Sequence, residues 1–418
     1  MSQIKIVQLQ SSMNSAGKSG LRLHSGFLEA GIDSTIISMN ADTIVDKKII
    51  YLISKSKTIK TINTKLEEFQ NRKNISELGT FSYPLLGTDI SKMEEVKNAD
   101  ILYFHWILGG FLNFSNIGDL FSLNKPVVII MHDMWWITGG CHHSFTCKKY
   151  KTHCFNCPIF PGNKKKDLSY KGFNKKLKIY SKHNNLYFVS PSKWLQQCAK
   201  DSFLAKDKPV YYIPNVIDKK IFKPLSRAFS REILNLHSNE TIVSFGAHSV
   251  DSPYKGWKYL RNALQLLYKD GLCNISVLVF GGGYNKEVAD AIPFKTEFVG
   301  YLKDEYSLAL VYNAIDVFIV PSLADNQPTV VMESLCCGTP VVGFNVGGIP
   351  DMISHKENGY LANYKDSRDL ADGIRFCIES KITGKILPSF EKNKVVNQHL
   401  ELINFVLGSK GKIHEPKL

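Results

Sequence analysis

The chain has 418 residues, of which 44% are hydrophobic and 22% are charged, a composition typical of folded globular protein. This composition excludes disordered and fibrous proteins, and no apolar run approaches the roughly 18 residues that a membrane-spanning helix needs. The first ten residues lead into a polar stretch rather than an apolar signal core, so we expect a cytoplasmic location. Nine cysteines are too few for a disulfide scaffold.

The net charge of +14 is concentrated in one part of the chain. Residues 141–200 contain 13 lysines and a single acidic residue, Asp167. Such a patch attracts polyanions, which include nucleic acid, anionic lipid and diphosphate groups. A lysine-rich solvated surface is the alternative.

Short runs rich in Val, Ile and aromatic residues alternate with amphipathic stretches along the first half of the chain. They predict strands at 4–10, 34–38, 101–106, 126–133, 186–192 and 209–215. Most of these runs are too continuous to have one face in water, which is typical of a parallel sheet with helices on both faces.

The same pattern restarts in the second half and predicts strands at 241–246, 275–283, 316–322 and 340–344. We therefore expect an α/β protein with two doubly wound, Rossmann-like domains that face each other across a cleft. The predicted divisions are a first domain at 1–215 with a Cys- and Lys-rich insertion at 134–185, a second domain at 216–385, and a C-terminal helix and tail at 386–418.

Ligands of open parallel sheets bind outside the carboxyl ends of the strands, so residues that follow strands are candidates for function. His105 follows one predicted strand, and His132 and Asp133 follow another. A histidine at such a place can orient a sugar hydroxyl or transfer a proton, because its ordinary pKa is near neutrality. The alternative is a structural imidazole that caps a loop.

The loop at 11–20 joins the first predicted strand to a helix, and its backbone N–H groups can hold an anion. It contains neither the dinucleotide pattern G-x-G-x-x-G nor a P-loop. From these residues alone, a plain connection between strand and helix is the favoured interpretation.

The segment 320–344 reads as a strand, a polar turn, a short helix, a second turn and a strand. Pro328 suits the first helical position, and the N–H groups of that helix N-terminus would form a diphosphate site. Asp325 precedes the helix, Glu333 falls in its second turn and can accept two ribose hydroxyls, and Lys255 can supply a counter-charge for phosphate. The alternative for the two acidic residues is a solvated helix face.

These motifs resemble the retaining glycosyltransferases of family 4. The similarity lies in Pro321-Ser322, D-N-x-P at 325–328, Glu333 followed by S-L-x-x-G-T-P-V-V, GGIPDMI at 347–353 and NGYLA at 358–362. Weaker similarity follows in order through most of the chain. The segment that begins at His132 and contains the four clustered cysteines looks like a subgroup found in bacterial surface-polysaccharide assembly.

The resemblance implies a GT-B fold and transfer of a sugar, with retention, from a nucleoside diphosphate sugar to a glycan or lipid-linked acceptor. Catalytic residues would be His132, Asp325 and Lys255, with His105 and Asp133 on the acceptor or sugar side. The donor would be held by Glu333, Lys255, Asn326, Gln327, Pro328, Thr329, Ser15, Ala16 and Gly17. No catalytic metal is expected.

Three features depart from the family pattern. Asp325 replaces a Glu, and Ala247 and Tyr254 replace arginines. The loop at 11–20 lacks the paired glycines that are common in the family.

Two other functions are kept as alternatives. One is a nucleotide-sugar epimerase or glycan phosphorylase of the same architecture. The other is a zinc-stabilised nucleic-acid-binding protein, but the spacing C-x5-C-x6-C-x2-C is not a common zinc finger, so nucleic acid is not an expected partner.

The lysine-rich segment 163–183 has Phe173, Leu177 and Tyr180 at helical spacing, with lysines elsewhere on the helix. This pattern predicts a helix lying on an anionic membrane surface, which would place the protein on the inner face of the plasma membrane. In the alternative interpretation the apolar stripe faces the domain core.

Four cysteines are clustered at Cys141, Cys147, Cys154 and Cys157. In a reducing compartment such a cluster more often binds a metal than forms disulfides, which predicts a structural zinc site. His142, His143 and His153 are substitute ligands. Reduced cysteines that pack as small hydrophobes, or disulfides, are the alternatives.

Overall fold

The computed structural model describes residues 3–13, 16–40, 46–52, 61–68, 79–160, 162, 164–236, 240–246, 253–282, 284–302 and 304–408. The chain divides into two compact units, one formed by residues 1–216 and 392–418 and the other by residues 217–391. Ser15, Ala247, the side chain of Ala16 and the tail 409–418 lie outside the described residues.

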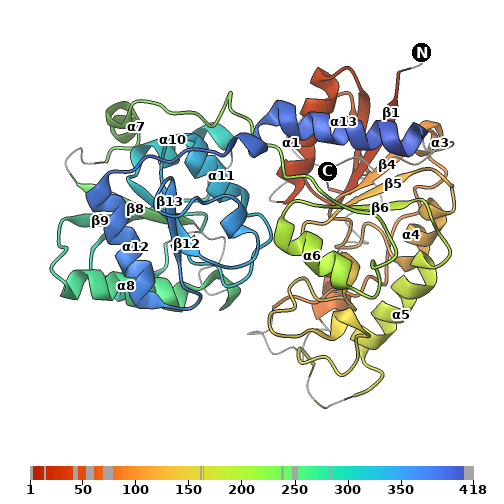
Figure 1. Cartoon of the computed structure of the whole chain (residues 1–418), viewed down its shortest axis with the longest axis horizontal. Helices are drawn as coiled ribbons and strands as arrows, with labels where there is room; N and C mark the ends of the chain where they lie inside the picture. Colours follow the sequence, from red (N-terminus) through yellow and green to blue (C-terminus); the bar gives the residue numbers. More distant parts are fainter. Residues whose placement is uncertain are drawn as a thin grey trace. The chain divides into compact units, whose positions relative to one another are not determined.

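A parallel sheet of seven strands forms the centre of the first unit (Figure 1). The strands are Lys5–Gln10 (β1), Asp33–Ser38 (β2), Ile49–Tyr51 (β3), Ile101–Phe104 (β4), Val127–Ile130 (β5), Leu186–Ser190 (β6) and Val210–Tyr212 (β7). Their order in the sheet is β3-β2-β1-β4-β5-β6-β7. The sequence jumps from β1 to β4 at the middle of the sheet, which is the topological switch point where such folds bind ligands.

Helices cover both faces of this sheet, as its apolar strands require. On one face lie Ala16–Glu29 (α1) and Lys392–Gly408 (α13), which run beside each other in Figure 1. The other face carries Phe114–Phe121 (α4), Leu168–Tyr180 (α5) and Lys193–Asp201 (α6), and a short helix, Glu94–Asn98 (α3), contacts β1. Alternate residues of β4 serve the two faces, since Tyr103 packs with α1 and α13 while Phe104 packs with the opposite layer.

The second unit contains a parallel sheet of six strands. The strands are Thr241–Gly246 (β8), Ile275–Phe280 (β9), Lys295–Gly300 (β10), Val317–Val320 (β11), Val341–Phe344 (β12) and Gly359–Ala362 (β13), in the order β10-β9-β8-β11-β12-β13. Trp257–Lys269 (α8) and Ser367–Ser380 (α12) pack on one face, and Glu305–Ala314 (α10) and Thr329–Cys336 (α11) pack on the other. Two shorter helices are Arg227–Ile233 (α7) and Lys286–Ala291 (α9).

The predicted α/β class with two doubly wound sheets is confirmed, and each of the predicted strands is present. Three strands were not predicted, namely β3, β10 and β13, and all three lie at sheet edges. None of the helices in the described part of the chain has the length and apolar composition needed to span a bilayer.

The apolar stripe of α5 faces the core of the first unit. Phe173 and Tyr180 are buried, and Leu177 packs against the same core. The prediction that this stripe lies in a membrane is therefore wrong, because the stripe already covers the sheet. The lysines on the opposite side of the segment are exposed and include Lys164, Lys165, Lys166, Lys171, Lys175, Lys178 and Lys182.

Candidate functional site

Loops at the carboxyl ends of β8 and β11 bring together the candidate residues of the second unit. Lys255 ends a 3-10 helix, Pro253–Lys255, and Gly256 follows it in the left-handed region with a φ of 71°. A Cβ at Gly256 would lie 1.8 Å from the carbonyl oxygen of Pro321, so only glycine permits this approach. The N–H of Leu323 donates to the carbonyl of Tyr254 at 2.7 Å and joins the two loops further.

Lys255 and Asp325 form an ion pair with 3.1 Å between Nζ and Oδ2. Both side chains are partly buried, and the charge of Asp325 raises the pKa of Lys255. The loop after β12 holds the Asp325 backbone, because the N–H of Gly348 donates to its carbonyl at 3.2 Å. The predicted phosphate-binding cation is thus paired with Asp325, the residue that departs from the Glu of the family that the sequence resembles.

The helix α11 begins directly after these loops. Pro328 occupies the N-cap rather than the predicted first helical position, and no side chain caps the helix start. Asn326 and Gln327, which precede it, are buried. The first N–H groups of α11 therefore provide partial positive charge near Asp325, as an anion site requires.

Glu333 lies in the second turn of α11, where only 2% of its surface is exposed. Its Oε2 accepts a hydrogen bond from the Tyr312 hydroxyl of α10 at 3.3 Å. A solvated helix face, the alternative considered for this residue, is wrong. Burying a carboxylate is costly unless it is hydrogen-bonded, so the position is consistent with a binding role.

In the first unit, His105 and His132 meet at the carboxyl ends of β4 and β5. Nδ1 of His105 lies 3.1 Å from Nε2 of His132, and Nε2 of His105 lies 2.8 Å from Oε1 of Gln8 in β1. The amide nitrogen of Gln8 donates to Ser34 at 2.9 Å, which leaves its oxygen as the acceptor. These contacts connect the two histidines to the centre of the sheet.

The hydrogen-bond partners of His105 and His132 determine which nitrogen of each ring carries the proton. Burial lowers the pKa of His105 well below its usual value and lowers the pKa of His132 to about 4, so both are neutral at pH 7. His105 donates from Nε2 to Gln8, and its Nδ1 must therefore accept a hydrogen bond from the Nε2–H group of His132. The lone pair of His132 is then on Nδ1.

Asp133 is held by its own loop. Its Oδ1 accepts from the Trp135 N–H at 2.8 Å, and its Oδ2 lies 2.5 Å from Nδ1 of His142, whose other nitrogen is 3.0 Å from Ser82. Burial alone would raise the pKa of Asp133, but the bonds from His142 and Trp135 keep it below its usual value. The role of Asp133 on the acceptor side stays a prediction.

Gly17 is in the first turn of α1, close to the preceding loop. A Cβ at this position would lie 1.9 Å from the carbonyl oxygen of Ser12. The glycine thus permits a tight start of α1, while the predicted contact with diphosphate stays untested.

The burial of two histidines in the first unit can be tested through the pH dependence of stability. His105 and His399 are at most 3% exposed, and burial lowers the pKa of His399 to about 3. Unfolded histidines titrate near pH 6.5, so below that pH the unfolded chain binds protons that the folded chain does not. The contribution of each of these two histidines to stability should be constant above pH 7 and should fall by about 1.4 kcal/mol per pH unit as the pH drops from 6.5 to 5.

Thermal unfolding measured at intervals of about 0.5 pH units between pH 6.5 and 5 would give the slope of stability against pH. His399→Gln should reduce the slope of stability against pH by about 1.4 kcal/mol per pH unit, which is the contribution of one histidine, even if the variant melts at a lower temperature throughout. A melting temperature that does not change between pH 6.5 and 5 would contradict the assignment of buried neutral histidines.

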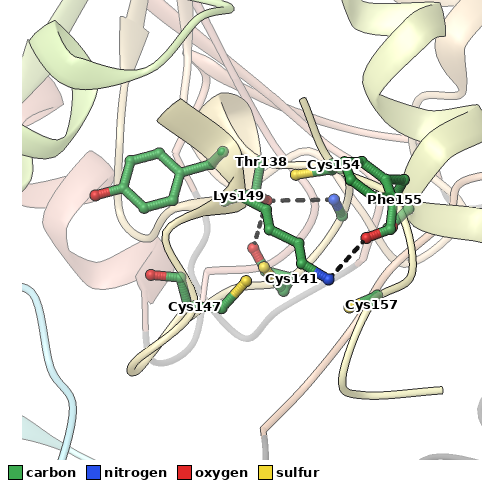
Figure 2. A pocket seen from close by; sticks show the side chains of 12 residues that line it. Thr138, Cys141, Cys147, Lys149, Cys154, Phe155 and Cys157 are labelled. Carbon is green, nitrogen blue, oxygen red and sulfur yellow. Dashed lines mark hydrogen bonds between the residues drawn. The ribbon is translucent and has the colours of Figure 1, made fainter. Parts of the chain in front are cut away.

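The four clustered cysteines line one small cavity in the first unit (Figure 2). Burial raises the pKa of Cys154 to about 12 and of Cys157 to about 11, and it also raises the pKa of Cys141. Among the described residues, no three His, Cys, Asp or Glu side chains are placed as a set that could hold a metal ion. The zinc site therefore stays a prediction.

Known proteins share this fold and part of this sequence. The family model of "Glycosyl transferases group 1" matches residues 239–380, which lie in the second unit. A D-inositol 3-phosphate glycosyltransferase of Rhodococcus opacus is 31% identical over 165 residues, which are 37% of this chain and 36% of that protein. The chain matches only 36–40% of the length of such curated relatives.

Solved structures are similar over nearly the whole chain. Anabaena Alr3699/HepE in complex with UDP and glucose has a TM-score of 0.62 at 16% identity, and the match covers 96% of this chain and 100% of that one. WaaG, a glycosyltransferase involved in lipopolysaccharide biosynthesis, has a TM-score of 0.58 at 13% identity, with 97% and 98% covered. The fold is therefore the GT-B-like, two-domain α/β fold of these structures.

Proposed function

We propose that the protein is a retaining glycosyltransferase of the hexosyltransferase type, with a nucleoside diphosphate sugar as donor. The observation that carries this proposal is the Lys255–Asp325 pair beside the N-terminus of α11, at the carboxyl ends of β8 and β11. It lies in the unit that the glycosyltransferase family model matches. The positive charge of Lys255 and the N–H groups at the start of α11 suit a diphosphate.

In the proposed reaction, the bond between the anomeric carbon and the diphosphate oxygen breaks, and a bond to the acceptor oxygen forms on the same face. The acceptor proton passes to the departing diphosphate. The residues have to position both substrates and offset the charge that develops on the leaving group. Lys255 and the N-terminus of α11 supply that charge, so the proposal includes no catalytic metal.

Separate observations support the proposed donor class and the proposed acceptor class. The structure of HepE with UDP and glucose supports a nucleotide-linked sugar, and the role of WaaG in lipopolysaccharide biosynthesis supports a glycan or lipid-linked acceptor in bacterial polysaccharide assembly. The exposed lysines near α5 suit an anionic membrane surface through charge alone, on the cytoplasmic side of the plasma membrane.

The test is release of free nucleoside diphosphate that depends on an acceptor. Thermal shift with uridine and guanosine diphosphate sugars would first identify the donor, because binding to the folded state raises the melting temperature. Acceptors would then be offered free in solution or in anionic vesicles. An epimerase would change the sugar without an acceptor, and a phosphorylase would require inorganic phosphate; either result would overturn the proposal.

A further inference from the structure

Between β5 and α5 the chain forms a long segment with little regular structure. In the described residues of this segment the helical elements are two 3-10 helices, Trp135–Ile137 and Lys149–Lys151. Cys141, Cys147, Cys154 and Cys157 all come from this segment, and all four line one cavity of about 20 Å³ with Lys149 (Figure 2). A space that holds about one water molecule also has room for one small ion.

We propose that these four cysteines bind one structural zinc ion as thiolates. Zinc prefers four tetrahedral sulfur or nitrogen ligands, and the pair Cys154 and Cys157 has the two-residue spacing of structural zinc sites. Asn156, between them, has a φ of 46°, which makes the tight turn that such a pair requires. No three of the described ligand side chains are placed as a ready metal-binding set, so the thiols would turn toward one another to form the site, and binding would release their protons to solvent.

The charge of the surroundings fits a thiolate-bound zinc ion. Four thiolates around Zn²⁺ have a net charge of −2, which needs nearby positive charge when buried. Lys176 of α5 is only 1% exposed, and its Nζ donates to the carbonyls of Trp135 and Thr138, the second of which lines the cavity. In the described part of the chain the charge of Asp133 acts on Lys176 without forming a salt bridge, so the dianionic centre would add negative charge beside this ammonium.

The zinc site would connect the irregular segment to α5 and to the loop that contains His132 and Asp133. The N–H of Cys157 donates to Asp167, the N-cap of α5, at 2.6 Å. Cys141 precedes His142, which lies 2.5 Å from Asp133 beside His132. One ion would thus stabilise a segment of the fold that has few helices and strands of its own.

Metal analysis of the full chain, purified without chelator, is the first test. We expect about one zinc per chain, and we expect Co²⁺ to replace it with the thiolate charge-transfer and tetrahedral absorption bands of a four-sulfur site. Folded protein that contains no zinc, and that gives no such spectrum with Co²⁺, would overturn the proposal. Mass spectrometry that finds disulfides within the cluster in freshly purified reduced protein would do the same.

Variants separate the site from general packing. Cys154→Ser with Cys157→Ser should lose the zinc, whereas Cys198→Ser should keep it, because Cys198 is also buried in the first unit but does not line the cavity. Lys176→Met should weaken zinc retention in competition with a chelator at least about tenfold, while Lys171→Met, exposed on the same helix, should not. Equal zinc retention in all four proteins would reject the assigned ligands and the role of Lys176.

Discussion

Lys255→Ala is expected to lower kcat/KM at least about tenfold, and up to about 150-fold, because a charge-assisted hydrogen bond contributes roughly 1.5–3 kcal/mol. The Lys255 ammonium is 3.1 Å from Asp325. A diphosphate would compete with that carboxylate for the same cation. Lys258→Ala is the matched control, since Lys258 lies in the first turn of α8 with its side chain exposed.

Glu333→Ala should cause a loss of similar size for a different reason. Its buried carboxylate would accept ribose hydroxyls, so affinity for a nucleoside and for a nucleoside diphosphate should fall together. Lys255→Ala should weaken only the diphosphate. Tyr312→Phe, which removes the hydroxyl 3.3 Å from Glu333 but leaves the carboxylate, reports how much of the effect comes from the buried hydrogen bond.

If Lys255→Ala and Glu333→Ala both had the kcat/KM of the wild-type protein, the assignment of the donor site would be contradicted. Asp325→Glu should be tolerated, because the longer side chain matches the family pattern and can still pair with Lys255. A large loss in that variant would show that the shorter acid is needed to position the lysine.

The central strands of both sheets could be predicted because they are buried on both faces. In β4 and β5 every residue is buried, and such continuous apolar runs are visible in a single sequence. The three strands that were not predicted, all at sheet edges, have no such signal. β3 has only three residues, and β10 is Lys-Thr-Glu-Phe-Val-Gly with no buried residue, so its partners in the sheet define it rather than its composition.

The candidate site was only partly predictable for a related reason. Positions after strands identified Lys255, Asp325, His105 and His132, because parallel strands end at one edge of a sheet. Their partners Gln8 and Tyr312 were missed, since a strand pattern does not show which distant side chain a polar group meets. A glutamine inside the apolar run of β1 was the available signal, because a buried amide needs a hydrogen-bond partner.

His132→Ala is expected to lower kcat by about 100-fold if His132 orients a sugar hydroxyl, since misplacing a substrate by about 1 Å can cost about 10² in rate. The hydrogen-bond order places the lone pair of this ring on Nδ1. His132→Asn, whose amide can present an acceptor near Nδ1, should therefore retain more activity than His132→Gln, whose amide reaches toward Nε2. Equal activity in the two variants would contradict the assigned tautomer.

Gln8→Leu tests whether the neighbouring residues act through His132. Leucine fills a similar volume but cannot accept from Nε2 of His105, so both rings can exchange tautomers. We expect kcat to fall about tenfold with KM little changed, which is the result of incorrect positioning rather than lost binding. Because the pKa of His132 is lowered to about 4, kcat of the wild-type protein should stay constant from pH 8 to 5. A decline centred near pH 6.5 would mean that the ring titrates as an exposed histidine and that Gln8 and His105 do not control it.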